Sequence, residues 1–317
     1  MAWLESFSTR IPALFDRMKV HDHSQSVNRG SATSGIKRRP GGSPKKSLGQ
    51  HFLKDSAISA RIVDAARIEP GETILEVGPG RGAITGMLAD QAEQLVLIEL
   101  DGALAAMLSE RYESQDNVRV IESDARDLDF EEGGDVPEVV GRPYKVVANL
   151  PYYAAANIIR RFLESNNPPT EIVVMIQREV ALEMAAPVGK MGMLSIATRF
   201  YADAEVLFDV PGSAFIPPPK VVSSVIRLVR REDKPLELDD EARFFKFVRA
   251  GFKAPRKQLH NSLSRGLIIE IEQASDIIAR AELDSMRRPR TLSISEWGRL
   301  YAAHSELEPK PEMGTDN

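Results

Sequence analysis

Short runs of apolar residues alternate with segments of helical periodicity through the middle of the chain. Runs rich in Val, Ile and Leu predict buried β-strands at 73–77, 95–99, 118–121, 144–148 and 171–176. Apolar residues recur at helical spacing before and between these runs, at 58–68, 84–92, 101–112, 158–163 and 177–184. This alternation predicts an α/β fold with a doubly wound, Rossmann-like sheet. Asp55 or Ser56 stands where the first helix needs a cap.

The pattern changes in the second half of the chain. Two further strands are predicted at 206–208 and 221–228, on either side of a loop with three successive prolines. From Asp240 the periodicity is helical, with a break at Ala254-Pro255 and later segments at 256–263, 273–281 and 295–303. We therefore expect a small C-terminal all-helical domain. The predicted parts are a disordered or weakly structured basic extension, a sheet domain, a helical domain and an acidic tail, at 1–44, 45–232, 239–305 and 306–317.

Composition removes several classes of site. The chain has 317 residues, of which 43% are hydrophobic and 27% charged, as in an ordinary globular protein. It contains no cysteine, which excludes disulfides, thiolate metal sites and the thiolate that attacks pyrimidine rings in carbon-5 methylation. Its 5 histidines show no paired spacing, so we expect no metal. No apolar stretch reaches the length that crosses a bilayer, so we expect no membrane partner.

Positive charge is concentrated in two segments, although the net charge of the chain is −5. Segments 26–46 and 246–265 each contain 6 Lys or Arg residues and no Asp or Glu. Local contacts with nucleic-acid phosphates require such islands, but charge runs also occur on solvated faces. Within the second segment, Lys253, Arg256 and Lys257 are our candidates for RNA contacts.

A glycine loop follows the first predicted strand of the sheet. Gly78-x-Gly80-x-x-Ala83 satisfies a relaxed dinucleotide fingerprint, and Glu99 ends the second strand where a ribose-binding acid belongs. A nicotinamide dehydrogenase and an S-adenosylmethionine methyltransferase share these features. A methyltransferase also needs an acid after the third strand for the adenine amine, and Asp124-Ala125 supplies one. Since nothing resembles the proton-transfer residue of a dehydrogenase, we favour the methyltransferase.

The stretch Asn149-Leu150-Pro151-Tyr152 follows the predicted strand 144–148 directly. An amide oxygen and a nearby backbone carbonyl can accept the two N–H groups of an exocyclic amine, while the tyrosine ring stacks on the base. Phe215, held by the rigid loop of prolines, could close over the base from the opposite side. Both features also have a purely structural interpretation. Asn149–Tyr152 would then be a strand end with a packed tyrosine, and Phe215 would be a core residue.

Together these motifs resemble the small-subunit ribosomal RNA adenine N6-dimethyltransferases. The matching stretches follow the family's order from about residue 45 to 303 and are GQHFL, EVGPGRGAIT, IELD, DA, NLPY, AFIPPPKV and RKQLHNSL. The resemblance implies an S-adenosylmethionine-dependent methyltransferase domain at 45–232 and an RNA-binding helical domain at 239–305. It also implies dimethylation of two adjacent adenines near the 3′ end of small-subunit ribosomal RNA, during maturation of that subunit. Two departures concern RNA contacts and helix capping: Ala254-Pro255 stands where polar and basic residues are usual, and hydroxyl residues are largely missing at 153–156.

The resemblance also assigns roles to individual residues. The implied cofactor contacts are Gln50, His51, Leu53, Gly78, Gly80, Glu99, Asp124, Ala125 and Asn149. Among these, His51 and Leu53 would meet the methionine end, Glu99 the ribose and Asp124 the adenine amine. The implied catalytic set is Asn149, Leu150, Pro151, Tyr152 and Phe215. In it, Asn149 and the carbonyl of Leu150 or Pro151 would hold the target amine, and two aromatic rings would sandwich the base.

Partners and alternatives follow from the same comparison. We expect a monomer that acts on small-subunit ribosomal RNA in immature small subunits in the cytoplasm. An organelle is the alternative if residues 1–44, which begin with apolar residues at helical spacing, form a transit peptide. Two other functions stay open: dimethylation of a large-subunit adenine that confers antibiotic resistance, and non-catalytic ribosome assembly on the same fold.

Overall fold

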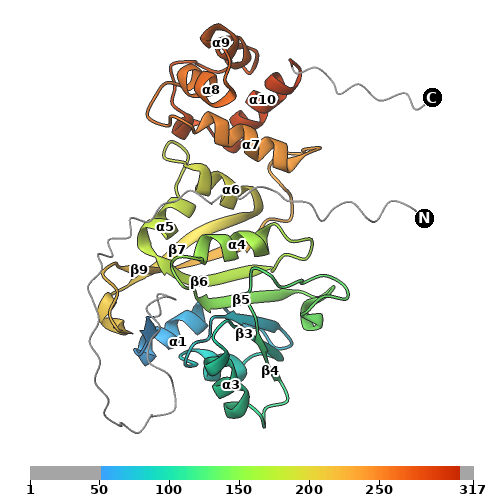
Figure 1. Cartoon of the computed structure of the whole chain (residues 1–317), viewed down its shortest axis with the longest axis vertical. Coiled ribbons are helices and arrows are strands. Elements are labelled where there is room, and N and C mark those ends of the chain that lie inside the picture. Colours follow the sequence, from blue (N-terminus) through green and yellow to red (C-terminus); the bar gives the residue numbers. More distant parts are fainter. Residues whose placement is uncertain (1–50, 308–317) are drawn as a thin grey trace, which may run out of the picture. The chain divides into compact units, whose positions relative to one another are not determined.

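The computed structural model describes residues 51–307 (Figure 1). The predicted N-terminal extension, the first basic segment, Gln50 and most of the acidic tail lie outside the described residues. The described chain divides into two compact units. The sheet unit contains 51–182 and 202–230, and the helical unit contains 183–201 and 231–307. Segment 183–201 thus belongs to the helical unit, whereas the sequence had placed it in the sheet domain.

A seven-stranded sheet forms the centre of the sheet unit, in the order β4-β3-β2-β5-β6-β9-β7. The strands are β2 (Thr73–Val77), β3 (Gln94–Glu99), β4 (Val118–Glu122), β5 (Tyr144–Asn149), β6 (Glu171–Gln177), β7 (Ala202–Val210) and β9 (Ser223–Arg230). The first five are parallel, and β9 pairs antiparallel with both β6 and β7. The predicted α/β class is therefore confirmed. Strand order reverses at β2, and ligands bind at the carboxyl ends of parallel strands beside such a reversal.

One helix of the sheet unit precedes the parallel strands, and others follow them. They are α1 (Ser56–Ala65), α2 (Thr85–Ala89), α3 (Gly102–Arg111), α4 (Ala155–Leu163) and α5 (Arg178–Met184), of which the last two residues belong to the helical unit. Asp55 caps α1, because its carboxylate accepts from the amides of Ala57 and Ile58 at 3.0 and 3.2 Å. The core contains Ile62 of α1, Leu88 of α2 and Leu95 of β3, all fully buried. Each such side chain contributes about 1.5–3 kcal/mol through its burial, which fixes the helices against the strands.

A second, two-stranded sheet joins segments that are far apart in the sequence. Strand β1 (Phe52–Leu53) pairs antiparallel with β8 (Phe215–Ile216), which follows the 3₁₀ helix η3 (Gly212–Ala214). The amide of Lys54 also donates to the carbonyl of Ala214 at 2.9 Å. The small sheet therefore ties the start of the described chain to the proline-rich loop.

Two buried cations close the carboxyl end of α1. The ammonium of Lys145 donates to the carbonyls of Ala66 and Arg67 at 3.1 and 2.8 Å. The guanidinium of Arg227 donates to the carbonyl of Ala65 at 2.8 Å. The last carbonyls of a helix lack partners within the helix, so these side chains satisfy them and also oppose the negative end of its dipole.

The helical unit has an aromatic core of its own. Its helices are α6 (Met193–Tyr201), α7 (Glu241–Gly251), α8 (Leu259–Leu267), α9 (Ile271–Arg280) and α10 (Ile294–Ser305), with short 3₁₀ turns such as η4 (Pro289–Thr291). Phe200 of α6 packs against Phe244 and Phe245 of α7, and Trp297 of α10 packs against Phe247. The contact of α6 with α7 explains why 183–201 belongs to this unit. None of the helices within residues 51–307 is long and apolar enough to cross a membrane.

Candidate active site

One cavity in the sheet unit brings together the catalytic and cofactor-binding candidates that the structure describes. It lies at the carboxyl ends of the parallel strands around β2, where the strand order reverses. The predicted residues that line it are His51, Leu53, Gly78, Gly80, Glu99, Asp124, Ala125, Asn149, Leu150, Pro151, Tyr152 and Phe215. The cavity also includes Glu76, Arg126 and Tyr153, to which the sequence had assigned no role there.

The glycine loop after β2 adopts a backbone that favours glycine. Gly78 and Gly80 have φ angles of +67° and +60°, in the left-handed region. A Cβ on Gly80 would come within 3.3 Å of the Phe52 ring, and one on Gly78 would lie 3.8 Å from the carbonyl oxygen of Asn149. The loop thus passes close to β1 and to the end of β5, and side chains on it would narrow the space between them.

Glu99 is fixed at the end of β3 by two backbone amides. Its carboxylate oxygens accept from the amides of Gly80 and Asp101, both at 2.9 Å. Burial raises the pKa of Glu99 above its ordinary value, although these two hydrogen bonds oppose that effect. A carboxylate has about four acceptor positions, so Glu99 keeps acceptor capacity beyond these backbone amides. Such an acid can bind two neighbouring hydroxyls of a ribose.

Asp124 follows β4 and is held by a neighbour along the chain. The guanidinium and the backbone amide of Arg126 both donate to its carboxylate, the amide at 2.9 Å. The Arg126 side chain therefore lowers the pKa of Asp124 below its ordinary value. Asp124 remains a charged acceptor at the rim of the cavity.

Glu76 is an acid that the sequence analysis missed. It lies within β2, is 1% exposed, and accepts a hydrogen bond from the hydroxyl of Thr85 at 2.7 Å. Burial raises the pKa of Glu76 to about 8. The only signal in the sequence was an acidic residue inside an apolar run, which gives no indication of burial. At neutral pH this part of the cavity wall therefore carries little negative charge.

The Asn149–Tyr152 stretch extends β5 and then turns into α4. The amide of Leu150 donates to the carbonyl of Met175 on β6 at 3.2 Å, which continues the ladder. The carbonyl of Pro151 accepts from the amides of Ala154 and Ala155, both at 3.0 Å. Because that carbonyl is already used at the start of the helix, the carbonyl of Leu150 is the better candidate for a second acceptor beside Asn149.

Aromatic rings form one wall of the cavity. The phenol of Tyr152 shares a hydrogen bond with the Ser223 hydroxyl at 2.7 Å, and its ring stacks on that of His51 at 5.9 Å between centroids. His51 Nδ1–H donates to the carbonyl of Pro217 at 2.7 Å, which fixes the imidazole. Phe215 borders the cavity, yet it is only 2% exposed and belongs to the core. The stacking partner that the structure gives Tyr152 is thus His51, and stacking of a base on Phe215 stays a prediction.

The RNA-contact candidates lie in the helical unit and are not part of this cavity. Lys253, Arg256 and Lys257 are exposed between α7 and α8. The carbonyl of Arg287 accepts from the amide of Leu259 at 2.7 Å, which brings the segment before η4 alongside them. Two exposed cations that the sequence analysis had not included lie there, Arg288 before η4 and Arg290 within it. Within residues 51–307, no cluster of His, Asp or Glu is arranged to hold a metal ion.

Comparison with known proteins identifies the family of the chain. The profile of the family Ribosomal RNA adenine dimethylase matches residues 42–299. Ribosomal RNA small subunit methyltransferase A of Dehalococcoides mccartyi is 39% identical over 264 residues, which are 83% of this chain and 89% of that protein. The protein of the same name from Geobacillus kaustophilus is 41% identical over 285 residues, 87% of this chain and 96% of its own.

Solved structures agree with the fold of the described chain. The 23S rRNA methyltransferase ErmE superposes with a TM-score of 0.62 at 26% identity, over 80% of this chain and 98% of its own. A dimethyladenosine transferase from Plasmodium falciparum superposes with a TM-score of 0.69 at 24% identity, over 81% of this chain and 98% of its own. At that identity the second likeness concerns the fold alone.

Proposed function

Because this chain belongs to the ribosomal RNA adenine dimethylase family, we propose that it transfers methyl groups from S-adenosylmethionine to small-subunit ribosomal RNA. The acceptors are the N6 amines of two adjacent adenines near the 3′ end of that RNA. Relatives at 39–41% identity that carry the name small subunit methyltransferase A support the choice of RNA. The observation that carries the proposal is one cavity lined both by acids suited to an adenosine and by the Asn149–Tyr152 stretch.

The donor set of the cavity fits S-adenosylmethionine. Glu99 keeps acceptor capacity on its carboxylate beside its backbone hydrogen bonds, which suits the hydroxyls of a ribose. The positive φ of Gly78 and the absence of a side chain there allow a ligand to approach the backbone. Asp124 is a charged acceptor for the adenine amine, and His51 and Leu53 border the same cavity for the methionine end. When bound, the cofactor supplies an activated methyl group on its sulfonium.

Asn149 and the Leu150 carbonyl prepare the target amine. The nitrogen of an adenine N6 amine is a weak nucleophile, because its lone pair is delocalised into the ring. Two carbonyl oxygens that accept its two N–H groups draw the amine toward a pyramidal geometry, which localises the lone pair. Once the nitrogen is methylated and cationic its proton is acidic, so no strong base is needed.

Tyr152 provides the platform for the base. A target adenine must leave its stack, at a cost of a few kcal/mol, and stacking on an aromatic ring restores about 1–3 kcal/mol. The hydrogen bond between Tyr152 and Ser223 fixes the ring plane before the RNA arrives. His51 covers part of that ring, so we expect it to share the stacking surface or to shift when the base enters.

The helical unit provides the electrostatic contacts with RNA. Lys253, Arg256 and Lys257 are exposed and lie in a segment without acidic residues. We expect them to bind phosphates of an immature small subunit, in the cytoplasm or, if residues 1–44 act as a transit peptide, in an organelle. The likeness to ErmE keeps dimethylation of large-subunit RNA as the second candidate, because the chemistry of the site would be the same.

Replacement of Asn149 by Ala tests the proposal. We expect methyl transfer to small subunits to fall by about 10²–10³-fold, the usual effect of removing one group that stabilises the transition state. Binding of S-adenosylhomocysteine, measured by calorimetry, should change only a few-fold.

Asn166→Ala is the matched control, because the Asn166 amide donates to Glu131 at 2.7 Å and neither residue lines the cavity. This variant should retain normal transfer. Wild-type turnover by Asn149→Ala would contradict the proposed role of the amide.

A further inference from the structure

The carboxylate of Asp124 is bound side-on by the guanidinium of Arg126. Arg126 Nε donates to Oδ1 at 2.9 Å and to Oδ2 at 3.1 Å, and Nη2 donates to Oδ2 at 2.5 Å. The backbone amide of Arg126 adds a further bond to Oδ1 at 2.9 Å. Both residues line the cavity, on the segment that follows β4.

These hydrogen bonds restrict the orientation of the Asp124 carboxylate. A carboxylate has about four acceptor positions. The amide, Nε and Nη2 of Arg126 use about three of them, so roughly one remains for an outside donor. A free aspartate can rotate about two side-chain bonds, whereas a planar guanidinium bound at two points holds both oxygens in one plane. Arg126 therefore determines where the remaining acceptor position points.

The local backbone alone would not give this orientation. The carbonyl of Asp124 accepts from the amide of Asp127 at 3.0 Å, which forms a turn but does not restrain the carboxylate. The Asp124 side chain is 16% exposed, so water can reach it and compete for its oxygens. Asp124 is the acid expected to accept a hydrogen bond from the adenine amine. The geometry of that hydrogen bond therefore depends on Arg126.

We propose that Arg126 is a positioning residue, which orients Asp124 to accept one N–H of the cofactor's adenine amine and so makes the site selective for adenine. The inference rests on the proposed function, because it takes the cavity to bind an adenosine. Arg126 itself acts through Asp124. Replacing Arg126 should therefore change the ratio of affinities for a purine with an amine and one with a carbonyl at that position. This effect should exceed any weakening of binding that both ligands share.

The test compares two ligands by isothermal titration calorimetry on the full chain. S-adenosylhomocysteine carries the purine amine, and S-inosylhomocysteine carries a carbonyl in its place. A hydrogen bond to a charged acceptor predicts that the wild type prefers the adenosyl ligand by about 10- to 100-fold. Arg126→Gln should lower this preference at least about fivefold, since the remaining Asp124 no longer has a fixed direction.

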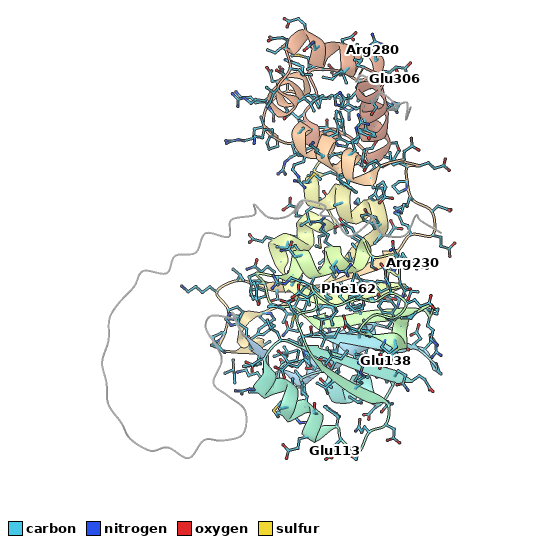
Figure 2. The ribbon with its side chains drawn as sticks, turned by 45° about the vertical axis from the view of Figure 1, so that its right-hand side comes forward. Glu113, Glu138, Phe162, Arg230, Arg280 and Glu306 are labelled. Atoms are coloured by element: carbon cyan, nitrogen blue, oxygen red, sulfur yellow. The ribbon has the colours of Figure 1, made fainter. Side chains whose placement is uncertain are left out.

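Arg119→Gln is the matched control. Arg119 lies on β4, and its Nη1 donates to both carboxylate oxygens of Glu138 at 2.8 Å. Figure 2 labels Glu138. The side chains of that pair are 44% and 18% exposed, against 43% and 16% for Arg126 and Asp124. Neither Arg119 nor Glu138 lines the cavity, so this variant should keep the wild-type preference.

The outcomes separate the inference from the proposed function. A wild type that binds neither ligand would overturn the proposed adenosine site and this inference with it. A wild type that binds both ligands equally would overturn the inference alone. A wild type with the expected preference that Arg126→Gln retains would overturn the inference alone. Equal weakening of both ligands in Arg126→Gln would also overturn it, because that result indicates a structural role. Partial unfolding cannot imitate the expected result, since it lowers both affinities and leaves their ratio unchanged.

Discussion

Glu76→Gln gives a sharp test of how the cavity wall is built. Glu76 is buried in β2 with the hydroxyl of Thr85 as its hydrogen-bond donor, and burial raises its pKa to about 8. Glutamine has nearly the same shape and can keep a hydrogen bond with Thr85, but it does not ionise. The two proteins should therefore differ in how their stability depends on pH.

The direction and size of this difference follow from proton binding. Above about pH 4.5 the unfolded chain loses the proton of Glu76, while the folded chain keeps it until about pH 8. The unfolded state then binds fewer protons, so stability falls as the pH rises through this window. At about 1.4 kcal/mol for each pKa unit, the wild type should lose roughly 3–4 kcal/mol more than Glu76→Gln between pH 5 and pH 8.5. Other buried acids, such as Glu99, are present in both proteins, and their effects largely cancel.

Urea denaturation at several pH values measures this difference. Circular dichroism follows both units, and in a Trp3→Phe background the fluorescence of Trp297 reports on the helical unit separately. Only the transition of the sheet unit should show the pH-dependent difference between the two proteins. Parallel pH profiles, in which the two proteins differ in stability by the same amount at every pH, would show that Glu76 is not held protonated in the folded protein.

Three further changes have defined outcomes. Lys145→Met removes a buried cation that contacts the carboxyl end of α1 and, at 2.8 Å, Glu72. The free energy of unfolding, measured by urea denaturation, should fall by about 3–5 kcal/mol, and an unchanged value would contradict this. Gly78→Ala should lower the free energy of unfolding by about 1–2 kcal/mol, because the φ of residue 78 is positive. Calorimetry should also show weaker binding of S-adenosylhomocysteine. Arg256→Gln with Lys257→Gln should lower the slope of log affinity against log salt for RNA by about 1.4–1.8, whereas an unchanged slope would show that both side chains are merely solvated.

Much of the sheet could be predicted from the sequence because its central strands are buried on both faces. Residues 172–176 of β6 are apolar and all buried, and an uninterrupted apolar run is the expected signature of that environment. The edge strand β7 alternates in burial, and only 206–208 were recognised of Ala202–Val210. Strands β1 and β8 each have two residues and form only because they pair with each other. Such a pair has no local signal in the sequence.

Positions at strand ends were predictable in the same way. Glu99 and Asn149 end two parallel strands on either side of β2, so the register of the sheet brings them to one edge. Side-chain directions were not predictable, because they depend on contacts between distant segments. The burial of Glu76 and Phe215 and the stacking of His51 on the NLPY tyrosine are of this kind. The ion pair of Arg126 with Asp124 joins residues two positions apart. That spacing alone does not distinguish an ion pair from two solvated side chains.

Nucleoside mapping identifies both the RNA and the atom that the protein methylates. Immature small subunits and large subunits are incubated separately with the protein and S-adenosylmethionine carrying a labelled methyl group, and the modified nucleotides are located by mass spectrometry. We expect N6,N6-dimethyladenosine at two adjacent positions near the 3′ end of the small-subunit RNA, and about 10²–10³-fold slower formation of it with Asn149→Ala. Label in the large-subunit RNA alone, or on any atom other than adenine N6, would overturn the proposed function.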